Sequence, residues 1–387
     1  MNNKVLEFGF TEDQIELQHM VRDFAAKELT WDKIREFDDR SEIPMEIYKK
    51  AADMGLTSIV IPEKFGGAGL GQIENAIVLE ELGYGSGGFA TTVGANGLAY
   101  DPVHYFGNDE QKAIFAKHIV GGGFAAFALT EANAGSDAGA LRTTAIKDGD
   151  FYVINGTKSF ITNGGVAGVY TVFALTDPDA GAKGLSCFVV ERDTPGVSIG
   201  SHEDKLGIRT SNTTEVIFEN VRVPAANLVG AEGKGFKIAM TTFDVTRPAA
   251  VGAGTCGGAR FLIDQCVNYS MTRITFGQPI LTNQAIQFKI ADMEIRLQAA
   301  RALCYKAAAM IDADQIDTTI AAAAKVAGSD GYLQTSIEAI QIFGGNGYSR
   351  EYPIEVHYRD AKIYQIFEGT NEIQRMVMIK SMMRDYM

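Results

Sequence analysis

The chain has 387 residues, of which 46% are hydrophobic and 21% charged, and its formal net charge is −13. This length predicts two or three globular domains. The acidic balance, without a block of Lys or Arg, argues against nucleic acid and anionic membrane surfaces as partners. The four cysteines show no CxxC spacing and the five histidines no HxxxH pair, so we expect no metal site and no disulfide framework. Reduced thiols, no targeting signal and no long apolar run predict a soluble protein, which would be cytoplasmic in a prokaryote.

Residues 10–120 show a helical pattern. Thr11 with Gln14, and Asn108 with Gln111, have the spacing of capping boxes at helix N-termini. Pro44 is typical of a helix start, and the glycines between residues 83 and 88 predict a loop. We therefore expect an N-terminal α-helical domain at residues 1–121.

From about residue 124 the pattern changes to short runs rich in β-branched and aromatic residues. These runs lie at residues 124–129, 152–154, 169–175, 185–191 and 215–218. Asp148-Gly149 and Asn155-Gly156 favour hairpin turns. Short strands at this spacing predict a β-sandwich or β-barrel, which we place at residues 122–232.

After about residue 235 the helical period returns over long, Ala-rich segments at residues 285–311, 320–343 and 373–383. They predict a helical bundle at residues 233–387, and the three blocks together predict an α+β multidomain fold. Gly252 to Gly257 matches the GxGxxG string of dinucleotide-binding loops, but no convincing strand precedes it. We interpret these small residues as a close contact between helices.

Near the C-terminus, Glu368-Gly369-Thr370 interrupts a helical pattern. Asn371 with Gln374 indicates a capping box that opens the next helix. The carboxylate of Glu368 is thus expected at a turn with apolar neighbours, an arrangement that suits a general base in an enclosed site. A solvated glutamate beside a helix cap is the alternative that the pattern leaves open.

Two further segments of the β block indicate a ligand site. Phe127 to Asp137 runs from an apolar strand into a turn of small and hydroxyl residues, which would present N–H groups and hydroxyls to a polar ligand or form an ordinary β-turn. Lys158 to Gly164 follows. In this order and spacing, with Phe243 to Arg247, Arg273 to Gly277, Gln341 to Gly347 and the Glu368 segment, the chain resembles the acyl-CoA dehydrogenases over nearly its whole length.

The resemblance implies a helical domain, a middle β domain and a C-terminal four-helix bundle. It also implies an FAD-dependent enzyme of fatty acid metabolism that converts an acyl-CoA to a trans-2-enoyl-CoA. Electrons would pass to electron-transfer flavoprotein, and the enzyme would be a homotetramer, a dimer of dimers. An enoyl-CoA reductase using the same residues in reverse, an acyl-CoA oxidase and a redox-inactive binding scaffold are the alternatives.

The site residues that the resemblance implies have three roles. Glu368 would remove the α-proton, since Thr246 stands where some relatives carry the base and cannot serve. The residues that would contact the substrate are Ser136, Asp244, Arg247, Glu368 and Gly369. Those that would contact FAD, some of them across a subunit interface, are Phe127, Leu129, Thr130, Gly135, Ser136, Phe160, Ile161, Thr162, Arg273, Thr275, Phe276, Gln284, Gln341, Ile342, Gly344, Gly345, Thr370 and Glu372. No metal is implied.

The sequence departs from the family pattern at two places, with Ala132 where Pro is usual and Phe160 where Trp is common. Neither position carries the chemistry. Ala90, Thr91 and Gly94 would lie on the helix that floors the acyl pocket, and their small size permits more than the shortest acyl chains.

Overall fold

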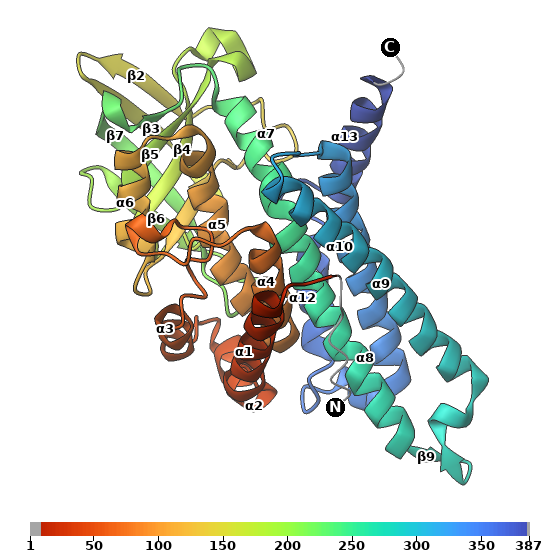
Figure 1. The fold of residues 1–387 in the computed structure, drawn as a ribbon. Helices are drawn as coiled ribbons and strands as arrows, with labels where there is room; N and C mark the ends of the chain where they lie inside the picture. The colour runs from red at the N-terminus through yellow and green to blue at the C-terminus, as the bar shows by residue number, and fades with distance from the viewer. Residues whose placement is uncertain (1–8, 385–387) are drawn as a thin grey trace.

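The computed structural model of the protein describes residues 9–384 and shows three blocks in chain order (Figure 1). The N-terminal helices of the described residues are α1 (Glu12–Glu28), α2 (Trp31–Arg40), α3 (Met45–Asp53), α4 (Gln72–Gly85), α5 (Gly87–Phe106) and α6 (Asp109–Ile119). The predicted capping boxes at Thr11 and Asn108 are both present, so local sequence sets where α1 and α6 begin.

The middle block forms one eight-stranded sheet with the order β6-β7-β3-β2-β4-β5-β8, and β1 pairs with β4 in parallel. Its strands are β1 (Ala125–Ala128), β2 (Thr144–Asp148), β3 (Phe151–Thr162), β4 (Val169–Leu175), β5 (Leu185–Glu191), β6 (Val197–His202), β7 (Thr213–Pro224) and β8 (Leu228–Val229). Every residue of β4 is buried, because helices α5 and α6 pack beside it and β1.

The C-terminal block is a bundle of long helices on the right of Figure 1. α7 (Gly235–Thr246), the π-helical segment η4 (Arg247–Ala253) and α8 (Gly254–Thr272) follow one another without a break. The remaining elements are the short pair β9 (Ile274–Thr275) and β10 (Gln278–Pro279), and the helices α9 (Gln284–Asp312), α10 (Thr318–Phe343), α11 (Gly345–Tyr348), α12 (Glu355–Tyr364) and α13 (Asn371–Arg384). The predicted fold class is therefore confirmed.

The GxGxxG string lies where η4 joins α8, at a helix contact. A Cβ added at Gly252 would lie 2.4 Å from the sulfur of Cys304 on α9, and one at Gly257 would lie 1.9 Å from the carbonyl oxygen of Glu80 on α4. Both distances are too short for any side chain. The interpretation as a close helix contact is confirmed.

Two sequence predictions were wrong. Residues 83–88 do not form a loop: Gly85 ends α4, Gly87 starts α5, and Ser86 alone connects them, capping α5 through Phe89 N. Asn155-Gly156 is not a hairpin turn but an irregularity inside β3, where the register with β7 shifts. Gly156 has φ +152° and a Cβ there would meet Thr143 at 2.3 Å. Glycine is therefore needed at this position because Thr143 lies so close, and not because the chain turns there.

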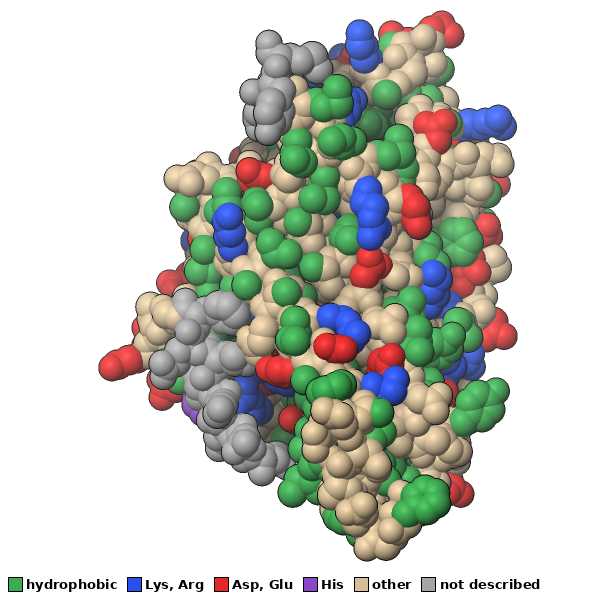
Figure 2. All heavy atoms as spheres, turned by 90° about the vertical axis from the view of Figure 1, so that its right-hand side faces the viewer, with side chains coloured by type: hydrophobic (Ala, Val, Ile, Leu, Met, Phe, Trp, Pro, Cys, Tyr) green, Lys and Arg blue, Asp and Glu red, His purple; other side chains and the backbone are tan. Residues whose placement is uncertain are grey.

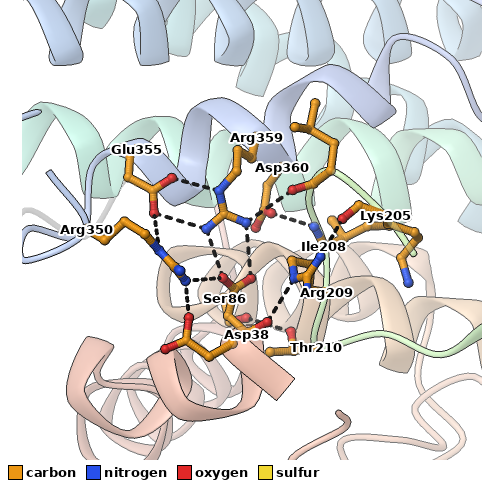
Figure 3. A network of polar contacts seen from close by, with 12 residues as sticks. Asp38, Ser86, Lys205, Ile208, Arg209, Thr210, Arg350, Glu355, Arg359 and Asp360 are labelled. Carbon is orange, nitrogen blue, oxygen red and sulfur yellow. Dashed lines mark hydrogen bonds and ion pairs between the residues drawn. The ribbon is translucent and has the colours of Figure 1, made fainter. Parts of the chain in front are cut away.

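Buried ion pairs fasten the N-terminal helices to the other blocks. On α4, Glu80 pairs with Arg301 of α9 at 3.1 Å, and neither side chain is exposed to solvent. On α2, Asp38 accepts from Arg359 of α12 at 2.8 Å, and Arg359 also pairs with Glu355 (Figure 3). The pairs of Arg359 fix the position of α12, the helix that leads to Glu368.

Candidate active site

Glu368 lies in the turn between α12 and α13. Its φ is +53°, and that of Gly369 is +88°. A non-glycine residue in the left-handed region is uncommon, and such residues gather at functional sites because the surrounding contacts must hold them there. A Cβ on Gly369 would lie 2.6 Å from Gln374 Nε2, so the turn needs a glycine after the glutamate.

Contacts from two helices hold this strained turn in place. The carbonyl oxygen of Glu368 accepts a hydrogen bond from Arg247 Nε at 2.8 Å and a longer one from Gln374 Nε2 at 3.4 Å. Arg247 is itself held by Asp244 Oδ1 at 3.3 Å, and Asp244 Oδ2 accepts from Thr318 Oγ1 at 2.7 Å. Among residues 9–384 the N–H of Glu368 has no acceptor, so it is free to donate to a ligand.

The Glu368 side chain is half-buried and one of its oxygens, Oε2, lies 3.2 Å from Thr246 Oγ1. Burial raises the pKa of the Glu368 carboxyl above its usual value, and the opposing effects of Arg247, Lys325 and Thr246 offset this only in part. A carboxylate whose pKa is shifted upward is a stronger base than an exposed glutamate. This electrostatic setting favours proton transfer over the alternative of a solvated surface glutamate.

The predicted capping box at Asn371 was wrong. Thr370 caps α13 instead, because its Oγ1 accepts from Ile373 N at 3.3 Å. The Asn371 side chain is buried and binds Lys325 Nζ through Oδ1 at 2.6 Å. Glu372 lies exposed on the first turn of α13.

The two segments predicted to face a flavin lie side by side. Ser159 N donates to Thr130 O at 2.9 Å, and Lys158 Nζ, which is fully buried, binds both Leu129 O at 3.0 Å and Glu131 Oε1 at 2.8 Å. This ion pair holds the turn after β1 against the middle of β3. The two segments, residues 127–136 and 158–162, therefore form one surface in which their relative position is fixed.

The side chains on this surface differ in what they can offer a ligand. Phe160 has φ +57° and is 62% exposed. Phe127, Thr130 and Thr162 are half-exposed, and Gly135 and Ser136 are exposed. The side chains of Leu129 and Ile161 are buried, so these two residues can meet a ligand only through their backbone.

Aromatic contacts connect this surface to Glu368. The Phe127 ring lies 5.4 Å from the Phe243 ring of α7, and the Arg247 guanidinium lies over Phe243 at 4.8 Å. Because Arg247 also binds the Glu368 carbonyl oxygen, one set of contacts connects the β domain with the Glu368 turn. The structure thus brings together Glu368, Gly369, Thr370, Asp244 and Arg247 with the neighbourhood of Phe127.

The remaining predicted residues form a second cluster at the other end of α8. The stacked rings of Tyr269 and Phe343, 4.1 Å apart, bring the segment that starts at Arg273 close to Gln341, Ile342, Gly344 and Gly345. Arg273, Phe276, Gln284 and Gln341 are exposed, Thr275 is half-exposed and Ile342 is buried. The 19 residues of α8 span about 28 Å. One chain therefore does not bring this cluster to Glu368.

Sequence reasoning missed three roles near Glu368: the charge of Lys325, the contact of Gln374 with the Glu368 carbonyl oxygen, and Phe243 as the ring beneath Arg247. Lys325 is fully buried, and a lone Lys among the alanines of residues 321–327 is the signal that could have revealed it. Of the described residues, no group of three or more His, Cys, Asp or Glu is placed to hold a metal. No helix within residues 9–384 is both long and apolar enough to cross a membrane.

Comparison with known proteins gives three family matches: the N-terminal domain of acyl-CoA dehydrogenases at residues 11–123, the middle domain at 126–221 and the C-terminal domain at 233–383. An acyl-CoA dehydrogenase of Bacillus subtilis is 44% identical over 96% of this chain and 98% of its own length. An acryloyl-CoA reductase (NADH) of Anaerotignum propionicum is 46% identical over 98% of this chain and 97% of its own.

Solved structures agree with these matches. The butyryl-CoA dehydrogenase of Megasphaera elsdenii superposes with a TM-score of 0.94 at 42% identity, covering 98% of this chain and 100% of that one. A chain from a structure on the electron-transferring flavoprotein of Acidaminococcus fermentans and flavin-based electron bifurcation has the same TM-score and coverage at 41% identity. The chain therefore belongs to the acyl-CoA dehydrogenase family of FAD-dependent oxidoreductases, close to its short-chain members.

Proposed function

We propose that the protein removes one hydrogen from each of the α and β carbons of an acyl-CoA thioester, giving a trans-2-enoyl-CoA, with Glu368 as the base. The single observation that carries this proposal is the half-buried carboxyl of Glu368 in a strained turn, with its pKa raised by burial. A base of this kind suits a weakly acidic C–H bond.

The residues of the family cofactor site fit a flavin. Phe160 offers an exposed aromatic face at a strand position where its ring has no packing partner in the core. Thr130, Thr162 and Ser136 offer hydroxyls beside it. Bound FAD supplies the two-electron acceptor for the β-hydrogen.

The chain itself contributes polarisation and positioning. The free N–H of Glu368 suits the thioester carbonyl oxygen, where negative charge develops as the α-proton leaves. Arg247, through its bond to the Glu368 carbonyl oxygen, fixes the direction of that N–H. Asp244 and Arg247 would line the approach of the CoA moiety, and Ser136 and Gly369 would contact the thioester.

We infer that a second copy of the chain supplies the cluster around Arg273. This cluster lies about 28 Å from the start of α8, too far to serve the same site. Figure 2 shows hydrophobic side chains spread among charges on the face where α9 and α10 lie. Phe276, fully exposed, and Phe288 and Ile295, more than half exposed, suit contact with another subunit, and a homotetramer is the assembly that the family resemblance implies.

The physiological acceptor would be an electron-transfer flavoprotein, as the name of the Acidaminococcus structure suggests. The second candidate is reduction of an enoyl-CoA by the same residues in reverse. The acryloyl-CoA reductase at 46% identity favours it.

Anaerobic titration of the purified flavoprotein tests the proposal. Acyl-CoA thioesters should bleach the flavin absorbance, and Glu368→Gln should keep the flavin but lower the bleaching rate by about a thousandfold or more. A yellow protein that no acyl-CoA bleaches, or a Glu368→Gln variant with full activity, would refute it. Reoxidation of the reduced enzyme by enoyl-CoA, measured at a series of potentials, then separates the two directions.

A further inference from the structure

α5 carries a buried acidic residue that this mechanism does not use. Asp101 is 2% exposed, and its Oδ1 has no hydrogen-bond partner among residues 9–384. Nor does its carboxyl form an ion pair with any described residue. Buried polar atoms in native proteins are nearly always paired, so an unpaired carboxyl oxygen indicates a partner supplied from outside the chain.

The position of Asp101 on α5 identifies the side from which that partner comes. Thr91, Gly94 and Leu98 are half-exposed residues of a helix that is otherwise mostly buried, and Asp101 follows Leu98 by three. Steps of three and four residues place all four on one face of the helix. Because this face of α5 is partly open while the rest of the helix is buried, we expect the face to line a cleft that a ligand can enter.

The neighbours of this face show that the space adjoins the catalytic turn. Thr91 Oγ1 lies 3.1 Å from the hydroxyl of Tyr364, the last residue of α12. A Cβ on Gly94 would lie 3.3 Å from Ala250 Cβ in η4, the segment that begins with Arg247. Tyr364 stands four residues before Glu368 in the chain, and Arg247 binds the Glu368 carbonyl oxygen, so this face of α5 lies near the Glu368 turn.

Electrostatics place the carboxyl of Asp101 within range of Glu368. Burial raises the pKa of Asp101 well above its usual value, and the negative charge of Glu368 raises it further. Tyr100 and Tyr105 are the other titratable groups that interact with it. Asp101 is thus a second buried acid within electrostatic range of Glu368, but without the cations that accompany Glu368.

We propose that Asp101 is a specificity-determining residue, whose free oxygen accepts a hydrogen bond from a hydroxyl or ammonium group on the acyl chain. This inference rests on the proposed function and narrows its substrate class from acyl-CoA to acyl-CoA bearing a hydrogen-bond donor. Oδ1 can accept such a bond whether or not the other oxygen carries a proton. A plain alkyl chain would leave it unpaired, and polar sites reject analogues that do so.

Matched thioesters test the inference on the flavin-loaded full chain. In each set a terminal methyl is replaced by OH or NH3+: pentanoyl-, 4-hydroxybutyryl- and 4-aminobutyryl-CoA, and the homologues hexanoyl-, 5-hydroxypentanoyl- and 5-aminopentanoyl-CoA. We expect kcat/KM for at least one donor-bearing member to exceed that of its methyl partner by about tenfold or more. The hydroxyl and ammonium arms identify the donor.

Asp101→Leu should reverse this preference, while Asp109→Asn, which removes a negative charge from an exposed residue of α6, should keep it. Removing an unpaired buried acid does not threaten folding, and flavin content verifies it. Two results would overturn the inference. One is a higher kcat/KM of the wild type for every methyl member. The other is an equal loss of kcat/KM for all thioesters in Asp101→Leu, which would indicate contact with the CoA part that all of them share.

The two proposals fail in different ways. If no thioester bleaches the flavin, the proposed function fails. Equilibrium binding of the same sets to Glu368→Gln, followed by calorimetry, then still measures whether Asp101 selects a donor. Equal affinity for the donor-bearing and methyl members would contradict the inference alone.

Discussion

The first half of α12 and the turn that follows its end use the same charged residue types for opposite purposes. In the first half of α12, Arg359 binds Asp38 at 2.8 Å and Glu355 at 2.7 Å, and the carbonyl oxygen of Leu206 at 3.2 Å (Figure 3). Burial alone would lower the pKa of Arg359, but the two carboxylates raise it above its usual value. At the following turn, the pKa of Glu368 is raised, because its cations do not fully offset burial.

The ion pairs of Arg359 serve the stability of the fold, whereas the carboxyl of Glu368 suits a chemical role. Direct hydrogen bonds to Asp38 and Glu355 stabilise the charged form of Arg359 and hold α2 against α12. The carboxyl of Glu368 has no direct ion pair among the described residues, and its backbone is strained. An acid whose burial is not fully offset by nearby cations is ready to accept a proton, and the ion pairs in the first half of α12 keep that helix in position.

Breaking the paired cluster should give the largest effect on stability. Arg359→Ala leaves Asp38, which is 2% exposed, with only the longer contact to Arg350 at 3.6 Å. Removing one partner of a buried pair costs about 3 kcal/mol or more, which should lower the thermal midpoint by several degrees. Scanning calorimetry measures this.

The matched control is Arg40→Ala on α2, the helix that also carries Asp38. Arg40 pairs with Glu36, both side chains are exposed, and such a pair contributes at most about 0.5 kcal/mol. Arg359 does not contact Glu368, so the surviving folded fraction should bleach at the wild-type rate. An unchanged midpoint would show that the network does not stabilise the fold.

Removing a cation near Glu368 should act on the reaction instead. Lys325 is fully buried, and its charge lowers the pKa of Glu368. Lys325→Met should therefore raise that pKa, so that more of the base is protonated at neutral pH. We expect kcat/KM at pH 7 to fall by about tenfold, with recovery at higher pH where Glu368 ionises.

The pH–rate profile is the measurement, because its acid limb should move to higher pH. Burial lowers the pKa of Lys325 itself to about 8, so the two profiles should differ chiefly below that pH. Lys362→Met, on the exposed face of α12, is the control. An acid limb that stays in place would mean that Lys325 does not act on the base.

Local sequence patterns predicted the strands that consist of a continuous apolar run between turns. Residues 169–175 and 185–191 were predicted as strands and are β4 and β5 to the residue, because continuous apolar runs between turns suit strands buried on both faces. Asn155-Gly156 failed because Gly156 serves a bulge, which needs the same backbone freedom as a turn. The two cannot be told apart without the partner strand β7.

The candidate site divides in the same way. The turn at Glu368 was predicted, since Gly369 and Thr370 lie beside it in the chain. The cap was assigned to Asn371 because its contact with Lys325, 46 residues away, cannot be read from sequence. Lys325 acts on the pKa of Glu368 through space, and Glu368 acts on that of Asp101. The packing of α5 and α10 near the turn determines which charges come near. Tertiary contacts thus set the electrostatics of the base.

The smallest effect should come from the hydroxyl nearest the base. Thr246 Oγ1 lies 3.2 Å from Glu368 Oε2 and 3.1 Å from Thr242 O. One hydroxyl proton cannot serve both acceptors, so the bond to Glu368 is a shared one and stabilises the carboxylate less than an undivided bond would.

Thr246→Val keeps the shape and removes this donor. The pKa of Glu368 should rise, so the acid limb of the pH–rate profile should move in the same direction as in Lys325→Met but by less, with a drop of a few-fold in kcat/KM at pH 6. Thr242→Val is the control, because the Thr242 hydroxyl donates to Ile238 O, one turn back along α7, and forms no hydrogen bond with Glu368 among residues 9–384. If both valine variants shift the limb equally, helix packing rather than the hydroxyl sets the pKa of Glu368; a shift confined to Thr246→Val shows that the shared proton reaches the base.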